Sequence, residues 1–457
     1  MNTLLSSIPN MNSLLEHAFF EGISHERVKQ AGRDYLDELR DSVKSGEIES
    51  LPSLDECARQ VLLRIEEDPR NLRGLINATG VILHTNLGRA PLGEEMCAAA
   101  LEICAGYCNL EYDLETGSRG SRYSHLEELI CKLVGAEASM VVNNNAAATL
   151  LMLCSIAQGN KVAISRGEMV EIGGSLRIPE IIKQSGSELI EVGSTNKTRL
   201  SDYVEAVEDK NAKVLLKVHT SNYEIVGFTE SVSVSELAEY GKSVGLPVLY
   251  DMGSCFLVEP ELLGLSAGET AVSGIGAGAD VICFSGDKLM GSAQAGIIAG
   301  RSEYITAMKK HPLTRAIRPD KLTLSILEAA LRLYRFPEEA IRRVPVLAML
   351  SYTQEELRQR AEGLAERLKY IFKDWCVSVC ETMDETGGGS LPNVPLPGWA
   401  VALKPSGMSV NELEDKLRRG RMPVIIRISD NKAIISPRTL LESDEDRLIE
   451  ALKATQL

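Results

Sequence analysis

A lone lysine lies in a turn that follows a short apolar run of the sequence. Residues 281–284 read Val-Ile-Cys-Phe, and Ser285, Gly286 and Asp287 lead from them to Lys288. A lysine amine condenses with an aldehyde only in its neutral form, which partial burial at the end of a strand favours. Lys288 is therefore the first candidate for covalent chemistry. A solvated lysine in an ordinary turn is the alternative.

Two further segments could assist such a lysine. Asp251 follows the apolar residues 246–250, so a carboxylate is expected at the C-terminal end of a buried strand, where ligands bind in open α/β sheets. A run of asparagines ending with Asn144 and Asn145 precedes Ala146 and a helical segment. The first backbone N–H groups of such a helix can approach a phosphate. An ordinary asparagine-capped helix is the alternative.

These three features together fit one cofactor, pyridoxal 5'-phosphate (PLP). Lys288 would bind its aldehyde, the start of the helix its phosphate, and Asp251 its ring nitrogen. An anion against that nitrogen keeps the ring protonated, and the protonated ring draws electrons from the α-carbon of an amino acid. The combination favours a PLP enzyme over three unrelated features.

Several arginines lie in segments without core periodicity. Arg89 and Arg122 are surrounded by glycine, serine and other small or polar residues, and Arg315 and Arg318 lie three positions apart in a third segment. A guanidinium offers a fork of donors that matches phosphate-like oxyanions. The four arginines therefore indicate an oxyanion site. Solvated or ion-paired surface side chains are the alternative.

Short β-rich runs alternate with helical stretches through the middle of the chain. This alternation is typical of a mainly parallel sheet covered by helices on both faces. The expected strands are residues 161–164, 188–192, 214–218, 248–250, 281–284 and 296–298.

The flanking regions differ from this central pattern, so we expect three domains. Residues 1–70 form a helical domain, residues 71–320 a large PLP-binding α/β domain, and residues 321–457 a small α+β domain with a connecting helix at 322–334. In the first domain, a helix with Leu36, Leu39 and Val43 on one face should end at Gly46, and Ser53 with Glu56 should form a capping box.

The small domain has its own strand and turn signals. Residues 399–403 read as a strand, and Ser409 with Glu412 should cap a helix that ends at Gly420. Residues 424–428 and 433–436 could pair as a hairpin across Asp430 and Asn431.

Composition limits the classes of function. The 457 residues carry a formal charge of −15, which argues against a broad basic surface for nucleic acid. The ten cysteines are scattered without a CxxC pair, so we interpret them as reduced core residues and expect no metal site. Neither a signal peptide nor a membrane-spanning run is present in the sequence. A cytoplasmic protein is expected.

The chain resembles the bacterial selenocysteine synthases, the L-seryl-tRNA(Sec) selenium transferases. The resemblance spans nearly the whole chain and is carried by residues 75–89, 120–125, 143–149, 284–288 and 315–321. It implies a fold-type-I PLP-dependent transferase of selenocysteine biosynthesis, assembled as a homodecameric ring of five dimers. It also implies that the N-terminal helical domain binds the tRNA.

The resemblance assigns roles to individual residues. Lys288 would hold PLP, with Asp287 beside it as a catalytic carboxylate, while Ser285 and the backbone of Asn144, Asn145 and Ala146 would hold the phosphate. The arginines that would bind a selenophosphate-like donor are Arg89, Arg122, Arg315 and Arg318. The Gly-Gly-Pro-Gln that is usual after the lysine turn is replaced here by residues 291–294, Gly-Ser-Ala-Gln.

The implied reaction converts seryl-tRNA(Sec) to selenocysteinyl-tRNA(Sec). The β-hydroxyl of the serine is eliminated to give a dehydroalanyl-tRNA, and selenium from selenophosphate then adds to the β-carbon. Because the substrate is an aminoacyl ester, no arginine is needed for a free α-carboxylate, and Arg427 in the small domain receives no role.

Two other functions stay open at the level of the sequence. A PLP-dependent lyase or ammonia-lyase could use the same arginines for the phosphate of a small molecule, and a non-catalytic tRNA-binding protein could retain a decayed PLP scaffold. Residues 1–70 distinguish the lyase from a tRNA-dependent enzyme, since a small-molecule lyase has no obvious use for a separate helical domain. Their eight basic and fourteen acidic residues, a formal charge of −6, do not by themselves indicate nucleic acid.

Overall fold

A computed structural model describes most of the chain and separates it into two compact units. The described residues are 4, 7–46, 48, 50–66, 71–172, 176–220, 222–392 and 394–456. One unit comprises Met1–Ile76, Lys416–Val424 and Ala451–Leu457, and the other comprises Asn77–Asp415 and Ile425–Glu450. The division into domains at residues 70 and 320 stays a prediction.

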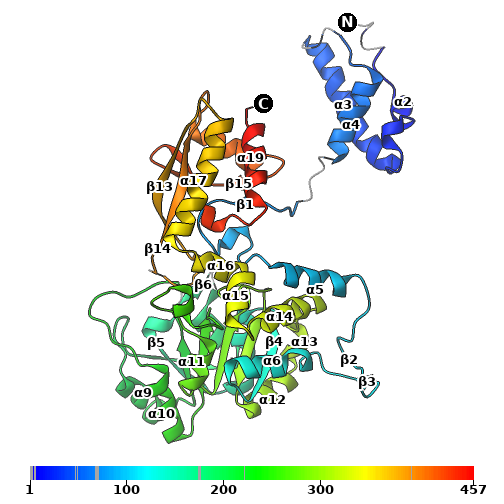
Figure 1. Cartoon of the computed structure of the whole chain (residues 1–457). Coiled ribbons are helices and arrows are strands. Elements are labelled where there is room, and N and C mark those ends of the chain that lie inside the picture. Colours follow the sequence, from blue (N-terminus) through cyan, green and yellow to red (C-terminus); the bar gives the residue numbers. More distant parts are fainter. Residues whose placement is uncertain are drawn as a thin grey trace. The chain divides into compact units, whose positions relative to one another are not determined.

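Short amphipathic helices build the N-terminal part of the first unit (Figure 1). They are α2 (Met11–Leu15), η1 (Ala18–Phe20), α3 (His25–Ser45) and α4 (Leu54–Glu66). The expected face of α3 is buried through Leu36, Leu39 and Val43, and the helix ends at Gly46, whose φ is 80°. The capping box that begins α4 is confirmed, because the Glu56 carboxylate accepts from the Ser53 backbone N–H at 2.7 Å.

A seven-stranded sheet forms the centre of the second unit. Its strand order is β4-β12-β11-β10-β9-β5-β8, and β12 runs antiparallel to both of its neighbours while the remaining pairs are parallel. The strands are β4 (Ala138–Val142), β5 (Lys161–Ser165), β8 (Glu188–Val192), β9 (Val214–Val218), β10 (Val248–Gly253), β11 (Val281–Ser285) and β12 (Gly296–Gly300). The expected mainly parallel sheet is confirmed.

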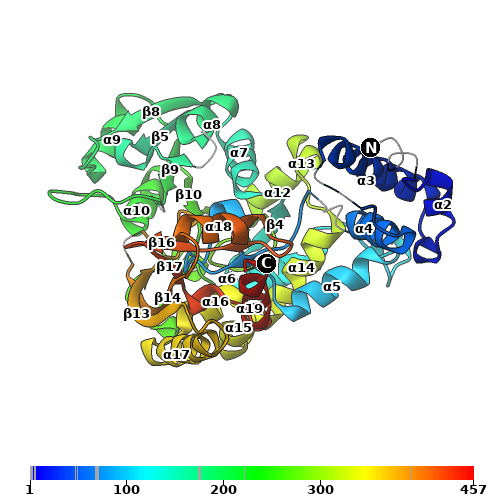
Figure 2. The ribbon, with the colours of Figure 1, turned by 90° about the horizontal axis from the view of Figure 1, so that it is seen from above.

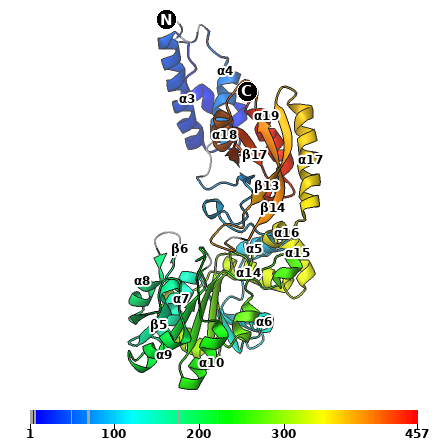
Figure 3. The same cartoon turned by 90° about the vertical axis from the view of Figure 1, so that its left-hand side faces the viewer.

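Helices cover both faces of this sheet, so its strands are buried on both sides. Figure 3 shows α7 and α8 on one side of the strands and α6 on the other. The first face buries side chains such as Met140 and Cys283 in one apolar cluster, and the opposite face buries Val141 and Phe284 in another. The covering helices are α6 (Ser124–Val134), α7 (Asn145–Ile156), α8 (Ile178–Gln184), α9 (Leu200–Glu208), α10 (Val234–Val244), α11 (Ala271–Gly276), α12 (Ser302–Lys310) and α14 (Lys321–Leu333).

A smaller antiparallel sheet completes the second unit, in the order β13-β14-β17-β16. Helix α17 (Gln354–Ile371) packs against β13 (Cys376–Asp384) and β14 (Leu396–Lys404), as Figure 2 shows. Strands β16 (Arg427–Ser429) and β17 (Lys432–Ile435) form the expected hairpin.

The hairpin differs from the prediction in one respect. Residues 424–428 do not form a single strand, because Val424–Ile425 is a separate strand, β15, that pairs with β1 (Ile76–Asn77). The turn residues Asp430 and Asn431 have φ values of 49° and 57°, the left-handed pair that a tight two-residue hairpin requires.

The remaining elements connect these parts. They are η2 (Thr85–Leu87), α5 (Glu94–Cys104), β2 (Tyr112–Asp113), β3 (Ser118–Arg119), η3 (Arg166–Glu168), β6 (Glu171–Ile172), β7 (Leu176–Arg177), η4 (Pro260–Leu263), α13 (Leu313–Ala316), α15 (Pro337–Arg343), α16 (Pro345–Ser351), α18 (Val410–Arg419), η5 (Pro437–Thr439) and α19 (Asp444–Ala454).

The cysteines are less uniformly buried than the sequence suggested. All ten are free thiols, but Cys97, Cys104 and Cys376 are exposed, so the interpretation as core residues is wrong for these three. Their apolar neighbours belong to amphipathic segments, and the thiols lie on the solvent side. Among the described residues, no helix is long and apolar enough to cross a membrane.

Candidate active site

Lys288 lies in a buried turn at the carboxyl end of a central strand. β11 ends at Ser285, and the turn that follows holds Lys288 with only 6% of its surface exposed. Burial, and secondarily the positive charge of Arg89, lower the pKa of the Lys288 amine. The neutral form, which is the nucleophile, is therefore favoured.

The turn is closed by backbone hydrogen bonds even though its sequence departs from the usual one. The N–H of Gly291 donates to the Lys288 carbonyl and the N–H of Ser292 to that of Gly286, both at 2.8 Å. Gly291 has a φ of 65°, and a β-carbon there would lie 2.4 Å from Val344 Cγ1. The glycine is required at this position, whereas the Ser292 hydroxyl is buried and has no hydrogen-bond partner in the part of the chain that the structure describes.

Asp251 is held as a hydrogen-bond acceptor on the next strand, β10. Its carboxylate accepts from Asn145 Nδ2 at 2.8 Å, from Thr149 Oγ1 at 2.7 Å and from the Gly253 N–H at 2.9 Å. The residue is 2% exposed. Two of these donors lie on α7, so the helix that follows the asparagine run also fixes the carboxylate. The sequence did not reveal this role of the Asn145 and Thr149 side chains.

The start of α7 presents free backbone donors. Asn144 caps the helix by accepting from the Ala147 N–H at 2.8 Å. In the described part of the chain, the N–H groups of Asn145 and Ala146 have no acceptor. A β-carbon at Gly296 would lie 2.2 Å from the Asn144 carbonyl oxygen, so the loop rests directly on β12 beside the end of β11. Such an N-terminus suits a phosphate.

Arg89 forms an ion pair with Asp287, one residue before the lysine. Arg89 Nη1 lies 2.8 Å from Asp287 Oδ2, and 11% of the aspartate side chain is exposed. The Arg89 backbone has a φ of 63°, a conformation that costs of order 1 kcal/mol for a side chain other than glycine. Arg89, in this left-handed conformation, follows Gly88, and its guanidinium is directed towards the lysine turn.

The other three arginines of the predicted oxyanion site line a cavity. Arg122, Arg315 and Arg318 line a cavity of about 520 Å³, together with Arg119 and Lys310. Arg89 is not among the described residues that line it. The sequence treated the four arginines as one oxyanion site, and the structure groups three of them and pairs the fourth with Asp287.

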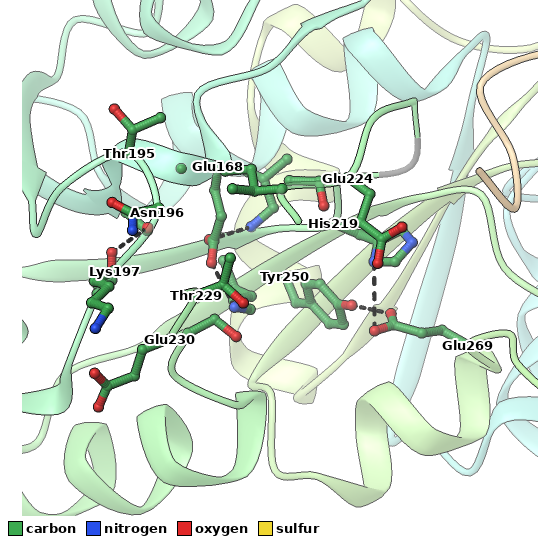
Figure 4. Close-up of a pocket in the computed structure, with 18 residues that line it drawn as sticks. Glu168, Thr195, Asn196, Lys197, His219, Glu224, Thr229, Glu230, Tyr250 and Glu269 are labelled. Atoms are coloured by element: carbon green, nitrogen blue, oxygen red, sulfur yellow. Dashed lines mark hydrogen bonds and ion pairs between the residues drawn. The ribbon is translucent and has the colours of Figure 1, made fainter. Parts of the chain in front are cut away.

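A second polar cavity, of about 300 Å³, lies beyond the carboxyl ends of β5 and β9 and was not anticipated (Figure 4). Its buried Glu168 accepts from Lys217 Nζ at 2.5 Å and from the Val218 N–H at 3.1 Å. Burial raises the pKa of Glu168, against the opposing effect of Lys217. The one sequence signal was Lys217, a charged residue inside an otherwise apolar strand.

The same cavity contains a chain of polar side chains that reaches the strand of Asp251. Figure 4 shows His219 and Tyr250 on either side of Glu269, with the Tyr250 hydroxyl donating to that carboxylate. His219 Nδ1 lies 3.5 Å from the other carboxylate oxygen, and the His219 backbone N–H donates to the Asp251 carbonyl at 2.9 Å. These contacts brace the end of β10.

The lysine-turn site fits PLP in its donors and acceptors. It combines a lysine whose amine is shifted towards its neutral form, a buried carboxylate fixed by three donors, and unpaired N–H groups at a helix start. The Asn145 Oδ1 atom is also buried, with no hydrogen-bond partner among the described residues. β4, β10 and β11 run in the same direction, so the three features lie at one edge of the sheet.

Comparison with known proteins identifies the family of this chain. A family model described as L-seryl-tRNA selenium transferase matches residues 75–441. The chain belongs to the L-seryl-tRNA selenium transferase family. The fold is accordingly that of the fold-type-I PLP-dependent transferases.

Curated members of the L-seryl-tRNA selenium transferase family match over nearly their full length. The L-seryl-tRNA(Sec) selenium transferase of Moorella thermoacetica is 47% identical over 454 residues, covering 98% of this chain and 96% of the relative. That of Hyphomonas neptunium is 46% identical over 466 residues and covers 100% of both chains. The relationship therefore includes the N-terminal helical region, which the family model does not match.

A solved structure shares the fold with this family member. D-glucosaminate-6-phosphate ammonia-lyase superposes with a TM-score of 0.59 at 20% identity, covering 85% of this chain and 98% of the other. This likeness concerns the fold alone. The much higher identity to the selenium transferases does not favour the lyase alternative.

Proposed function

We propose that this chain converts seryl-tRNA(Sec) to selenocysteinyl-tRNA(Sec), with PLP as its cofactor and selenophosphate as the selenium donor. Membership of the L-seryl-tRNA selenium transferase family is the observation that carries the proposal. The buried lysine turn and the arginine-lined cavity supply chemistry that agrees with it.

PLP would be held by Lys288 through its aldehyde, by Asp251 at the ring nitrogen, and by Ser285 with the N–H groups of Asn145 and Ala146 at the phosphate. When bound, it supplies an electron sink for the α-carbon of the serine. Lys288 then has two tasks in our proposal. Its amine binds the cofactor between turnovers, and during turnover it removes and returns the proton at the serine α-carbon.

Asp287 and Arg89 would act beside the lysine. The pair is buried enough to persist, and Asp287 lies next to Lys288 in the turn, so its carboxylate is our candidate to assist departure of the β-hydroxyl. Arg89 balances its charge. Arg122, Arg315 and Arg318 would bind the oxyanion of the selenium donor, since guanidinium groups offer paired donors to phosphate-like oxygens.

The N-terminal helical domain, residues 1–70, is our candidate for the tRNA contact, and a homodecamer built from five dimers is our candidate assembly. The acidic balance of residues 1–70 favours recognition by shape with few phosphate contacts. Size measurement of the purified protein in solution tests the assembly.

The decisive assay combines the purified protein with seryl-tRNA(Sec) and selenophosphate and scores the aminoacyl group released from the tRNA. Selenocysteine is the expected product, and a chain without residues 1–70 should lose this activity. Release of ammonia from a phosphorylated amino sugar by both chains would instead support the lyase alternative.

A further inference from the structure

Glu111 is the carboxylate that lies among the arginines of the 520 Å³ cavity. Its Oε1 atom accepts from Arg122 Nε at 3.0 Å and Nη2 at 2.5 Å, and lies 3.6 Å from Arg318 Nη1. Its Oε2 atom accepts from Arg119 Nη2 at 3.4 Å. One internal anion therefore contacts three of the guanidinium groups around the cavity.

These contacts use all the nitrogens of the best-buried arginine. Arg122 has 10% of its side chain exposed, and its third nitrogen, Nη1, donates to the Pro319 carbonyl at 2.6 Å. Three of the five guanidinium N–H groups are therefore engaged, and the edge formed by Nε and Nη2 is occupied by Glu111. An oxyanion can bind at that edge in the usual two-pronged manner only if the Glu111 carboxylate moves away.

Arg315 also lines the cavity. Arg315 is exposed, and its side chain has no hydrogen-bond or ion-pair partner among the residues that the structure describes. Lys309, which also lines the cavity, is paired with Glu127 at 2.5 Å. Arg315 is thus available to an incoming anion without the displacement of an internal partner.

The loop of Glu111 does not need the carboxylate for its conformation. The backbone of the hairpin β2–β3 is held by the pairing of Tyr112 with Arg119 and by the Gly120 N–H, which donates to the Glu111 carbonyl at 3.0 Å. The Gly117 N–H donates to the Asp113 carbonyl at 2.9 Å. The side chain of Glu111 is therefore available for a role other than folding.

We propose that Glu111 is an internal competitor for the selenium donor: its carboxylate occupies the guanidinium groups of Arg122 and Arg318 until a phosphate-like dianion displaces it. The proposal rests on the function proposed above for the arginine cavity. The electrostatic attraction between these arginines and a monoanion is no stronger than their attraction to the Glu111 carboxylate, whereas their attraction to a dianion is stronger. Glu111 would thus select for the more highly charged oxyanion.

The charge state of Glu111 supports this role. Hydrogen bonding from Arg122 lowers the pKa of the Glu111 carboxyl, so the group is ionised at neutral pH. The other ionisable groups that line the cavity are Arg119, Arg122, Tyr123, Lys309, Lys310, His311, Arg315 and Arg318. Burial raises the pKa of Tyr123, so its hydroxyl is neutral and Glu111 is the anion with which an incoming oxyanion competes among the described lining residues.

Inorganic phosphate binding to the full-length protein, measured by calorimetry without tRNA, tests the proposal. The variant Glu111→Gln keeps the size of the side chain and removes its charge. We expect it to bind phosphate about tenfold more tightly than the unaltered protein, and to bind the monoanion nitrate with a larger gain. Glu115→Gln is the matched control, since it removes one charge from the same hairpin at an exposed position that has no arginine partner among the described residues, and should leave both affinities unchanged.

Unchanged or weaker phosphate binding by a folded Glu111→Gln protein would overturn the proposal. Glu111→Asp provides a second variant, because the shorter carboxylate retreats from Arg122 and should give a smaller tightening. Loss of folding in both variants would show that the carboxylate is structural, and would also overturn it.

Arg315→Ala separates this proposal from the function on which it rests. If phosphate binds the unaltered protein but Arg315→Ala does not weaken it, the cavity is not the donor site and the proposed function loses that part. If Arg315→Ala weakens binding and Glu111→Gln does not tighten it, the donor site stands and only the competitor role fails.

Discussion

The lysine turn and the arginine cavity place charge in two different environments. Around Lys288 the carboxylates are buried and paired. Asp251 accepts hydrogen bonds from two side chains of α7, and Asp287 forms an ion pair with Arg89. Around the cavity the arginines are mostly exposed, and their main partner is Glu111, while Arg315 is unpaired among the described residues.

The difference indicates a division of labour. Burial lowers the pKa of the Lys288 amine and holds its partners in place, which suits bond making at a single carbon. Around the cavity one carboxylate is shared by Arg122, which has 10% of its side chain exposed, and the more exposed Arg119 and Arg318, and we propose that a solute anion can replace it. This contrast supports our proposal that the first region carries out the chemistry and the second binds an ionic substrate.

The largest effect should follow from Lys288→Ala. Loss of the amine removes both the covalent hold on PLP and the base at the α-carbon, so selenocysteinyl-tRNA formation should fall by about 10³-fold or more. The visible absorbance of the lysine-bound cofactor should disappear. Lys132→Ala, at an exposed position on α6, is the control and should retain both. An unchanged spectrum of Lys288→Ala would remove the cofactor assignment.

Arg315→Ala should separate the two regions. Because Arg315 lines only the cavity, PLP absorbance should be unchanged while product formation falls by about 100-fold. Activity with selenophosphate and the spectrum are the two measurements. Arg332→Ala, an exposed residue paired with Glu328, serves as the control. Full activity of Arg315→Ala would refute a role in binding the donor.

Thr149→Val should weaken the hold on the cofactor without changing the cavity. The buried Asp251 carboxylate loses its 2.7 Å hydrogen bond, and a bond to a charged group contributes about 1.5–3 kcal/mol, so PLP affinity should fall by about tenfold or more. Thr149→Ser retains the hydroxyl and should restore most of the affinity. Equal affinities for the valine variant and the unaltered protein would contradict the bracing of Asp251.

Arg89→Ala should shift the pH dependence of PLP binding to Lys288. Arg89 lowers the pKa of Lys288, so its loss, which also leaves Asp287 unopposed, raises that pKa and reduces the neutral amine at a given pH. The midpoint of the rate at which PLP condenses with the cofactor-free protein should move to higher pH, by up to about one unit. Arg301→Ala, paired with Asp280 at the surface, should not move it. A midpoint that falls or stays would contradict the electrostatic role of Arg89.

Local patterns in the sequence predicted much of the fold. The strands at residues 188–192 and 214–218 have the predicted bounds, because both are short β-rich runs between polar turns. Residues 214–218 form a largely buried central strand, whereas 188–192 form an edge strand with Glu188 and Glu191 exposed. The turn at Asp430 and Asn431 and the capping box at Ser53 follow equally from local chemistry. The lysine turn and Asp251 could be placed at one sheet edge for the same reason.

Contacts between distant segments could not be predicted. Nothing near Glu111 in the sequence indicates that it contacts Arg318, which comes from a different part of the chain. Glu168 with Lys217, and Arg89 with Asp287, are likewise pairs separated by many residues. The split of residues 424–428 has the same origin, since β15 pairs with the distant β1. Such partners depend on the tertiary arrangement and leave no periodic signal.

Borohydride reduction of the PLP-loaded protein, followed by mass mapping of its peptides, tests the central claim most directly. A covalent cofactor on one buried amine should leave a reduced pyridoxyl label on Lys288 alone. A label on another lysine, or the absence of any label in protein that forms selenocysteinyl-tRNA, would contradict the account.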